Sequence, residues 1–232
     1  MKNRHWRPAA ARQSGWFGTR WVGRQARQRE AMRSIDFDLE ARRISGDLPP
    51  EPRLVVIGSS AFWGSDTESI CRACGSRLAD IENLTLITGG VTGVGETVGR
   101  AFHQARESSG APSRVFHILP VGSDSWDYGV TLFVGNNMLE RREVLVRLGR
   151  VCLALEGGPG TDHEASVALS QGLTLIPVGR TGGASGKFYG RMSCPKHLDP
   201  KSWGCLGNPQ SELLELTDAI GNLVTSSLSV DA

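Results

Sequence analysis

Residues 151–164 have the sequence VCLALEGGPGTDHE, in which five apolar residues lead directly into a glycine-rich turn. A short apolar run that is closed by glycine is typical of a buried strand. The polar residues after the turn have the character of the first turn of a helix. This stretch therefore predicts a strand, a tight turn and a helix, which is the repeating unit of an α/β fold.

The same turn is a candidate site for phosphate. Backbone N–H groups at the start of a helix carry partial positive charge and bind anions. Thr161 would set a hydroxyl beside such a site, and Glu164 would set a carboxylate there, three residues into the helix. This combination fits a phosphorylated small molecule and acid–base chemistry on it. It fits equally a structural turn, in which Thr161 caps the helix and Glu164 completes a T-x-x-E capping box.

The chain from Arg53 onward repeats this alternation of apolar strands and helices. Buried strands are expected at residues 54–57, 84–88, 115–119, 130–134, 151–155 and 173–178. Helices are expected near residues 66–80, 94–108, 137–148, 161–171 and 213–228. Continuously apolar strands that alternate with helices predict a Rossmann-like doubly wound parallel sheet with helices on both faces.

Two glycine-rich turns indicate where a ligand would bind. One follows the expected strand at 84–88, and the other follows the strand at 151–155. Ligands of doubly wound folds bind beyond the carboxyl ends of the strands, so both turns lie at the expected edge. Residues 179–208 are rich in Gly, Pro and Ser and are longer than an ordinary connection, which indicates a lid or substrate loop.

The charge of the chain is unevenly distributed. Residues 1–29 contain eight Lys and Arg and no Asp or Glu, whereas the remainder has 18 basic and 24 acidic residues. We expect residues 1–50 to form a basic, poorly ordered leader and residues 51–232 to form a Rossmann-like nucleotide-binding domain. The leader is compatible with organelle import, with a disordered tail or with a misassigned start codon. The acidic main body excludes nucleic acid as its partner on charge grounds.

Hydropathy and cysteine content argue against a membrane protein, a disulfide-linked protein and a metal site. No stretch approaches the roughly 18 apolar residues that span a bilayer, so we expect a soluble, cytoplasmic protein with no membrane partner. Five cysteines are an odd number, which argues against a disulfide framework. Cys71 and Cys74 form a C-x-x-C without a tight second pair of ligands, so no metal site is expected.

Three common motifs fail on inspection. A dinucleotide fingerprint built on Gly93 and Gly95 needs its third glycine at position 98, but that glycine stands at 99. Residues 182–187 imitate a phosphate-binding P-loop without its flanking residues or a convincing strand-to-helix context. The chain has no G-x-S-x-G elbow, so serine hydrolase chemistry is unsupported.

Four segments resemble one known family, in the same order along the chain. Residues 89–96, GGVTGVGE, are similar to its GGGPGIME segment, and residues 157–164, GGPGTDHE, are similar to its PGGxGTxxE segment. Residues 138–142, MLERR, resemble its M-x-x-R-K helix, and residues 58–60 match its GSS turn. The family is LONELY GUY, the lysine-decarboxylase-like cytokinin riboside 5′-monophosphate phosphoribohydrolases of cytokinin activation. The resemblance covers about residues 53–180.

This resemblance implies a Rossmann-like homodimer that hydrolyses the N-glycosidic bond of a nucleoside 5′-monophosphate. The products would be the free base and ribose 5-phosphate, and no cofactor would be needed. The catalytic pair would be Arg141 and Glu164. The resemblance also implies a set of phosphate- and nucleotide-binding residues: Gly58, Ser59, Gly89, Gly90, Gly93, Glu96, Met138, Arg142, Gly157, Gly158, Gly160 and Thr161.

Glu156 is the main departure from that family, which has proline at this position. In addition, Val91 replaces a glycine, Gly95 replaces a methionine, and Arg142 replaces a lysine. We expect the extra carboxylate of Glu156 to lie near the phosphate and to weaken or redirect its binding. An alternative function is therefore a non-catalytic nucleotide-binding sensor or carrier module of the same superfamily, because a shared fold does not prove catalysis.

Overall fold

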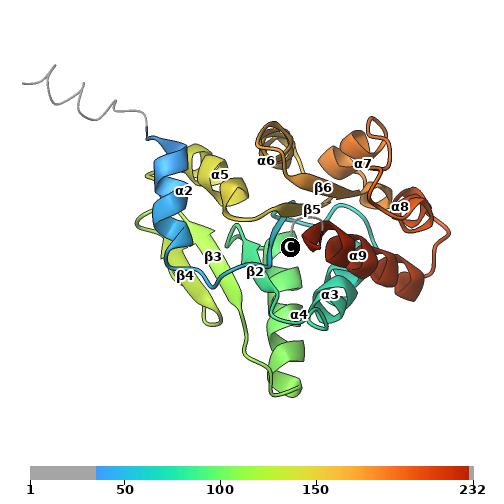
Figure 1. Cartoon of the computed structure of the whole chain (residues 1–232), viewed down its shortest axis with the longest axis horizontal. Coiled ribbons are helices and arrows are strands. Elements are labelled where there is room, and N and C mark those ends of the chain that lie inside the picture. Colours follow the sequence, from blue (N-terminus) through green and yellow to red (C-terminus); the bar gives the residue numbers. More distant parts are fainter. Residues whose placement is uncertain (1–34, 230–232) are drawn as a thin grey trace, which may run out of the picture. The chain divides into compact units, whose positions relative to one another are not determined.

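The computed structural model describes residues 35–229 of the chain. Most of the basic leader, residues 1–34, lies outside this range, and so do the predictions that were made for it. The described residues form a six-stranded sheet with helices packed on it (Figure 1).

All strand pairs in this sheet are parallel, and the strand order is β4-β3-β2-β1-β5-β6. The strands are β1 (Arg53–Gly58), β2 (Thr85–Thr88), β3 (Val115–Leu119), β4 (Val130–Phe133), β5 (Val151–Leu155) and β6 (Thr174–Val178). In the central register, Val56 of β1 lies opposite Thr88 of β2 on one side and Leu153 of β5 on the other. The chain runs outward from β1 in one direction through β4 and then restarts at β5, so the order reverses between β1 and β5.

Helices cover both faces of the sheet, which confirms the doubly wound fold. They are α2 (Phe37–Ser45), α3 (Thr67–Leu78), α4 (Val94–Ser108), α5 (Met138–Leu145), α6 (Pro159–Ser170), α7 (Gly183–Tyr189), α8 (Pro200–Gly207) and α9 (Leu213–Leu228), with short 3-10 turns η1 (Val146–Leu148) and η2 (Gly179–Thr181). Figure 1 shows α5 and α6 on one side of the sheet and α3, α4 and α9 on the other.

Strand β1 contributes side chains to the hydrophobic core on both faces of the sheet. Leu54 and Val56 belong to the buried cluster under α3, α4 and α9, whereas Val55 and Ile57 belong to the cluster under α2, α5 and α6. Successive side chains of a strand point to opposite faces, and here both faces are covered by helices. This is why the strand is continuously apolar.

Helix α2 changes the expected boundary of the domain. The side chain of Asp36 caps this helix, because its carboxylate accepts hydrogen bonds from two N–H groups of the first turn. Ala41 and Ile44 of the helix are buried, together with Leu48 after it. These residues pack against α5 and η1, so the boundary expected at residue 51 is corrected to about residue 36.

The segment at residues 179–208 is not a lid or a loop. It forms η2, α7 and α8, and it buries Phe188, Trp203 and Leu206. The rings of Tyr189 and Trp203 are stacked with centroids 5.9 Å apart. The glycines that indicated a loop lie at the turns and in the short helices, and two of them, Gly179 and Gly207, leave room for the ring of Tyr189.

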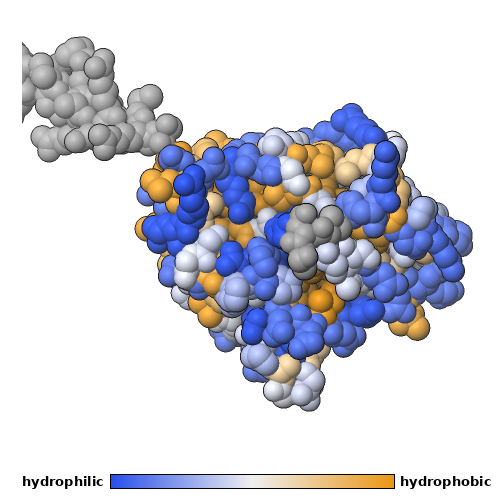
Figure 2. Space-filling view, in the orientation of Figure 1, coloured by the Kyte–Doolittle hydropathy of each residue, from blue (hydrophilic) through white to orange (hydrophobic). Residues whose placement is uncertain are grey.

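None of the helices in the described part of the chain is both long and apolar enough to cross a membrane. Figure 2 shows that hydrophilic residues predominate on the face seen in that orientation and that hydrophobic residues form smaller groups between them. Scattered apolar residues of this kind are normal on a protein surface.

Candidate functional site

A cavity of about 480 Å³ opens where the order of the strands reverses. Its lining comes from the end of β1, from the turns that follow β1, β2 and β5, and from helices α4, α5 and α6. Cavities of this size hold small-molecule ligands, and the reversal point is the usual binding position in doubly wound folds. Ten of the fourteen predicted site residues line it: Gly58, Ser59, Gly89, Met138, Arg141, Arg142, Gly158, Gly160, Thr161 and Glu164.

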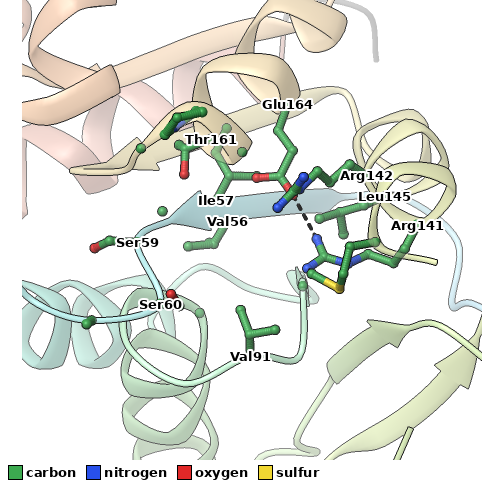
Figure 3. A pocket seen from close by; sticks show the side chains of 18 of the residues that line it. Val56, Ile57, Ser59, Ser60, Val91, Arg141, Arg142, Leu145, Thr161 and Glu164 are labelled. Atoms are coloured by element: carbon green, nitrogen blue, oxygen red, sulfur yellow. Dashed lines mark hydrogen bonds and ion pairs between the residues drawn. The ribbon is translucent and has the colours of Figure 1, made fainter. Parts of the chain in front are cut away.

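The centre of the cavity holds an ion pair between two helices. Nη1 of Arg141 on α5 donates to Oε1 of Glu164 on α6 at 2.7 Å, and both side chains are buried (Figure 3). Within residues 35–229, no hydrogen bond reaches Oε2 of Glu164, and the buried Nε of Arg141 has no partner either. Buried polar atoms are normally hydrogen-bonded, so unpaired atoms beside a cavity indicate a place for ligand or water.

Burial also changes the acidity of this carboxylate. It raises the pKa of Glu164 above the usual value of 4.5, although the charges of Arg141 and Arg142 oppose the shift. Burial likewise lowers the pKa of Arg141, while the carboxylate of Glu164 opposes the change. Perturbed carboxylates in a cavity are candidates for acid–base chemistry.

The first turn of α6 provides a place for an anion next to this pair. Gly158 is the N-cap and Pro159 is the first helical residue, and no side chain caps the helix. Thr161 lies inside the helix, so the capping-box interpretation of T-x-x-E is wrong. Thr161 lines the cavity, and within residues 35–229 its hydroxyl makes no hydrogen bond. The free N–H groups, this hydroxyl and the helix dipole all favour a bound anion.

Arg142 adds a cation on the same side. Its Nε lies 3.9 Å from Oε1 of Glu164, and the side chain is 31% exposed, so it reaches the cavity (Figure 3). A Cβ atom on Gly160 would lie 2.6 Å from Nη2 of Arg142. The guanidinium therefore lies against the first turn of α6, where a phosphate would meet both positive groups.

Gly89 has a similar relation to Arg141. A Cβ atom at this position would lie 2.7 Å from Nη1 and 3.0 Å from the central carbon of the guanidinium. The two glycine-rich turns thus let two arginines approach the backbone closely. The guanidinium of Arg141 lies against Gly89, and the guanidinium of Arg142 lies against Gly160.

Alanine at Gly89 is expected to destabilise the protein by about 1–3 kcal/mol, the usual cost of overpacking a buried site. The buried guanidinium of Arg141 cannot move away without weakening its pair with Glu164. Gly95 is the matched control, because it also lines the cavity but lies in α4, and its added Cβ would stay 3.6 Å from Thr88. Gly95→Ala should stabilise the helix by about 0.5–1 kcal/mol. Urea denaturation measures both changes, and equal effects of the two variants would contradict the close approach.

The carboxylate of Glu156 does not lie where the sequence placed it. The side chain is fully buried and points into the loop after β1. Its two oxygens accept hydrogen bonds from the hydroxyls of Ser59 and Thr67, both at 2.6 Å, and from the N–H groups of Trp63 and Gly64, at 3.1 and 2.8 Å. Glu156 is not part of the cavity lining, so the expectation that it lies at the phosphate is wrong.

These four hydrogen bonds also set the charge state of Glu156. Burial alone would raise its pKa, but the hydrogen bonds from Ser59, Thr67, Gly64 and Trp63 outweigh burial and lower the pKa. The residue has φ +51°, a conformation that costs a non-glycine residue about 1–2 kcal/mol. The hydrogen-bonded carboxylate offsets this strain. The predicted ligand contact of Ser59 is also modified, because its hydroxyl proton is directed to Glu156.

Four predicted ligand contacts lie outside the cavity lining. Gly90 accepts a hydrogen bond from the indole of Trp126 at 2.8 Å through its carbonyl, and Gly93 is the N-cap of α4 with φ +82°. Glu96 makes an ion pair with an arginine on the same helix at 3.4 Å. Gly157 has φ +98° and lies against Thr161, where a Cβ atom would be 2.3 Å away. Gly90, Gly93 and Gly157 shape the turns around the cavity, whereas Glu96 lies in the first turn of α4.

Trp63 is one of the lining residues that were not predicted from the sequence. It follows β1 in the loop GSSAFWG, and its side chain is 61% exposed although it lines the cavity. The available signal was its place after the first strand, at the edge where ligands bind in such folds. The rings of Trp126 and Tyr128 pack against His117, with centroids 5.7 and 4.7 Å from its ring.

The model of the SLOG cluster4 family matches residues 52–193. Among solved structures, the structural-genomics target TM1055 has 25% sequence identity and a TM-score of 0.53, covering 66% of this chain and 89% of that chain. The molybdenum cofactor carrier protein of Chlamydomonas reinhardtii has 19% identity and a TM-score of 0.54, covering 75% of this chain and 99% of that chain.

A third structure, the molybdenum cofactor binding protein of Rippkaea orientalis, has 20% identity and a TM-score of 0.51, covering 74% of this chain and 96% of that chain. At these identities the two cofactor proteins show a shared fold alone. A search of the curated proteins finds no significant match.

Proposed function

The chain belongs to the SLOG cluster4 family, and from this premise we propose that it hydrolyses the N-glycosidic bond of a nucleoside 5′-monophosphate. The observation that carries the proposal is the buried pair of Glu164 and Arg141 in the cavity, with one carboxylate oxygen unpaired among the described residues. The anion site at the first turn of α6 lies next to this pair.

The proposed phosphate site is the first turn of α6. There the N–H groups of Gly160 and Thr161, the hydroxyl of Thr161 and the guanidinium of Arg142 converge. Glu164 follows Thr161 by three residues, so it lies within one helical turn, about 5.4 Å, along the axis. This spacing is comparable to a ribose ring, which would bring the glycosidic carbon toward the carboxylate.

In the proposed reaction, a water oxygen forms a bond to C1′ of the ribose while the bond from C1′ to the base nitrogen breaks. Oε2 of Glu164 takes the proton of the attacking water, and the leaving base keeps the bonding electrons and takes a proton from solvent. Arg141 holds Oε1 and so orients the carboxylate. A raised pKa suits this role, because a general base works best when its pKa approaches the working pH. The same carboxylate stabilises the oxocarbenium-like transition state.

The direct test is incubation of the full chain with AMP and with N6-modified adenosine monophosphates. We expect free base and ribose 5-phosphate in equal amounts, separated and quantified by chromatography. The corresponding nucleosides without phosphate are the matched controls, and they should react much more slowly because they lack the group that Arg142 and α6 bind. The absence of base release from every nucleotide tried would refute the hydrolase proposal.

A second candidate is a non-catalytic nucleotide-binding module, and one observation favours it. Oε1 of Glu164 is already held by Arg141 at 2.7 Å and lies 3.9 Å from Arg142, which is also how a purely structural ion pair is built. Isothermal titration calorimetry separates the two candidates. Nucleotide affinity without base release would select the binding module.

A further inference from the structure

The indole of Trp63 differs from an ordinary exposed apolar residue in the way its backbone is held. The backbone N–H group of Trp63 donates to Oε1 of Glu156 at 3.1 Å, and the backbone N–H group of Gly64 donates to the same oxygen at 2.8 Å. Ser59 and Thr67 bind the carboxylate from the two ends of this loop. A fully buried charge thus fixes the position of a mostly exposed aromatic residue.

The ring lies beside the turn that begins α6. A Cβ atom on Gly158 would be 3.5 Å from the ring, and a Cβ atom on Gly183 would be 2.9 Å from it. The ring edge therefore packs on glycine backbone, with no side chain in between. Trp63 is 61% exposed and lines the cavity, next to the turn where the phosphate is proposed to bind.

We infer that Trp63 is an aromatic platform that stacks on a planar heteroaromatic ring of the phosphorylated ligand and that Glu156 is its positioning residue. The ring is the nucleobase when the ligand is a nucleoside monophosphate. This inference rests on the phosphate-binding part of the proposed function and does not require hydrolysis. Tryptophan suits the role because its large π face stacks on any base, so removing it should weaken binding by about 5- to 100-fold.

The test compares two ligands on three forms of the full chain. The ligands are the carbocyclic analogue of AMP, which has no N-glycosidic acetal to hydrolyse, and ribose 5-phosphate, which has no base. The proteins are the wild type, Trp63→Ala and Trp63→Phe. We expect Trp63→Ala to lower the affinity for the AMP analogue, measured by calorimetry, by at least 5-fold and the affinity for ribose 5-phosphate by less than 2-fold. Trp63→Phe should retain most of the affinity for both ligands.

The outcomes separate the two proposals. If the wild type binds both ligands and Trp63→Ala leaves their affinity ratio unchanged, the stacking role is overturned and the phosphate site stands. If the wild type binds neither ligand, the phosphate site and the stacking role fail together. An equal loss of both ligands in Trp63→Ala would show that the residue only supports the turn.

The role of Glu156 is tested by a double-mutant cycle. Glu156→Gln keeps a hydrogen-bond acceptor for the loop but loses the charge. We expect it to lower the affinity for the AMP analogue by about 3-fold or more and to leave the affinity for ribose 5-phosphate unchanged. In the Trp63→Ala background the same substitution should have no further effect, because Glu156 acts through the indole. Additive losses in the double variant would overturn the positioning role.

Discussion

Glutamine in place of Glu164 is expected to lower the rate of base release by about 10²- to 10⁴-fold, the usual contribution of a general base. The substitution keeps the size of the side chain and a hydrogen bond for Arg141, but the amide cannot take a proton from water. Binding of the AMP analogue should change much less than turnover, because the proposed phosphate site is formed by Arg142 and the first turn of α6. Steady-state rates of base release and calorimetry with the analogue check the two expectations.

The matched control for this variant is Glu143→Gln. Glu143 lies on the same helix as Arg141, and its carboxylate lies outside the cavity, where it contacts Arg147 at 2.9 Å and His163 at 2.8 Å. It should retain near-normal turnover. Removing the charge of Glu164 leaves Arg141 buried without a counter-charge, which can cost about 3–5 kcal/mol. If Glu164→Gln does not fold, Glu164→Asp is the alternative, because it keeps the charge but places the carboxylate farther from the substrate. It should also lower the rate of base release. Full activity in a folded Glu164→Gln protein would exclude the proposed base.

Leucine in place of Glu156 is expected to lower the free energy of unfolding by about 3–5 kcal/mol. The substitution removes the acceptor of four hydrogen bonds, two from the buried hydroxyls of Ser59 and Thr67 and two from the part-buried N–H groups of Trp63 and Gly64, and each buried donor that is left unsatisfied costs about 1–3 kcal/mol. Backbone strain at φ +51° is the same for both residues, so it does not offset the loss. Glu156→Gln should cost less, because its amide oxygen still accepts from the loop. Urea denaturation of the three proteins gives the ranking.

The pH dependence of this difference has a definite sign. The folded-state pKa of Glu156 is lowered from its usual value of 4.5, so its contribution to stability is fully present above that value. The contribution is lost as the pH falls below 4.5 and through the folded-state pKa. The stability gap between the wild type and Glu156→Gln should therefore be constant near neutral pH and shrink in acid. A gap that grew in acid would contradict the hydrogen-bonded carboxylate.

The strands and most helices were predictable from the sequence. A strand that is buried on both faces is a continuous run of apolar residues, and such runs are easily recognised. The strand expected at 151–155 agrees with β5, and the helix expected at 213–228 agrees with α9. Helices α7 and α8 were missed, because their glycines and prolines are typical of loops and their stability comes from packing around Trp203. Tertiary contacts of this kind override local propensity.

The candidate site was predictable only in part, and the reason is side-chain direction. The resemblance implied that Arg141 and Glu164 form a pair, and in the structure their side chains are in contact. Glu156 was misplaced because its partners Ser59 and Thr67 are 97 and 89 residues away in sequence. No local pattern shows which of two loops a carboxylate will face. The homodimer and the cytoplasmic location stay predictions.

The internal carboxylate of Glu156 has a consequence for the energetics of recognition. Many loops at such sites become ordered only when an incoming anion satisfies their N–H groups, and the lost chain entropy then weakens binding. Here the chain supplies its own anion to the loop between Ser59 and Thr67, so this ordering is completed during folding. A ligand at the proposed site would meet a loop that these hydrogen bonds already hold in place, so more of its interaction energy would remain available as affinity and as discrimination between similar compounds.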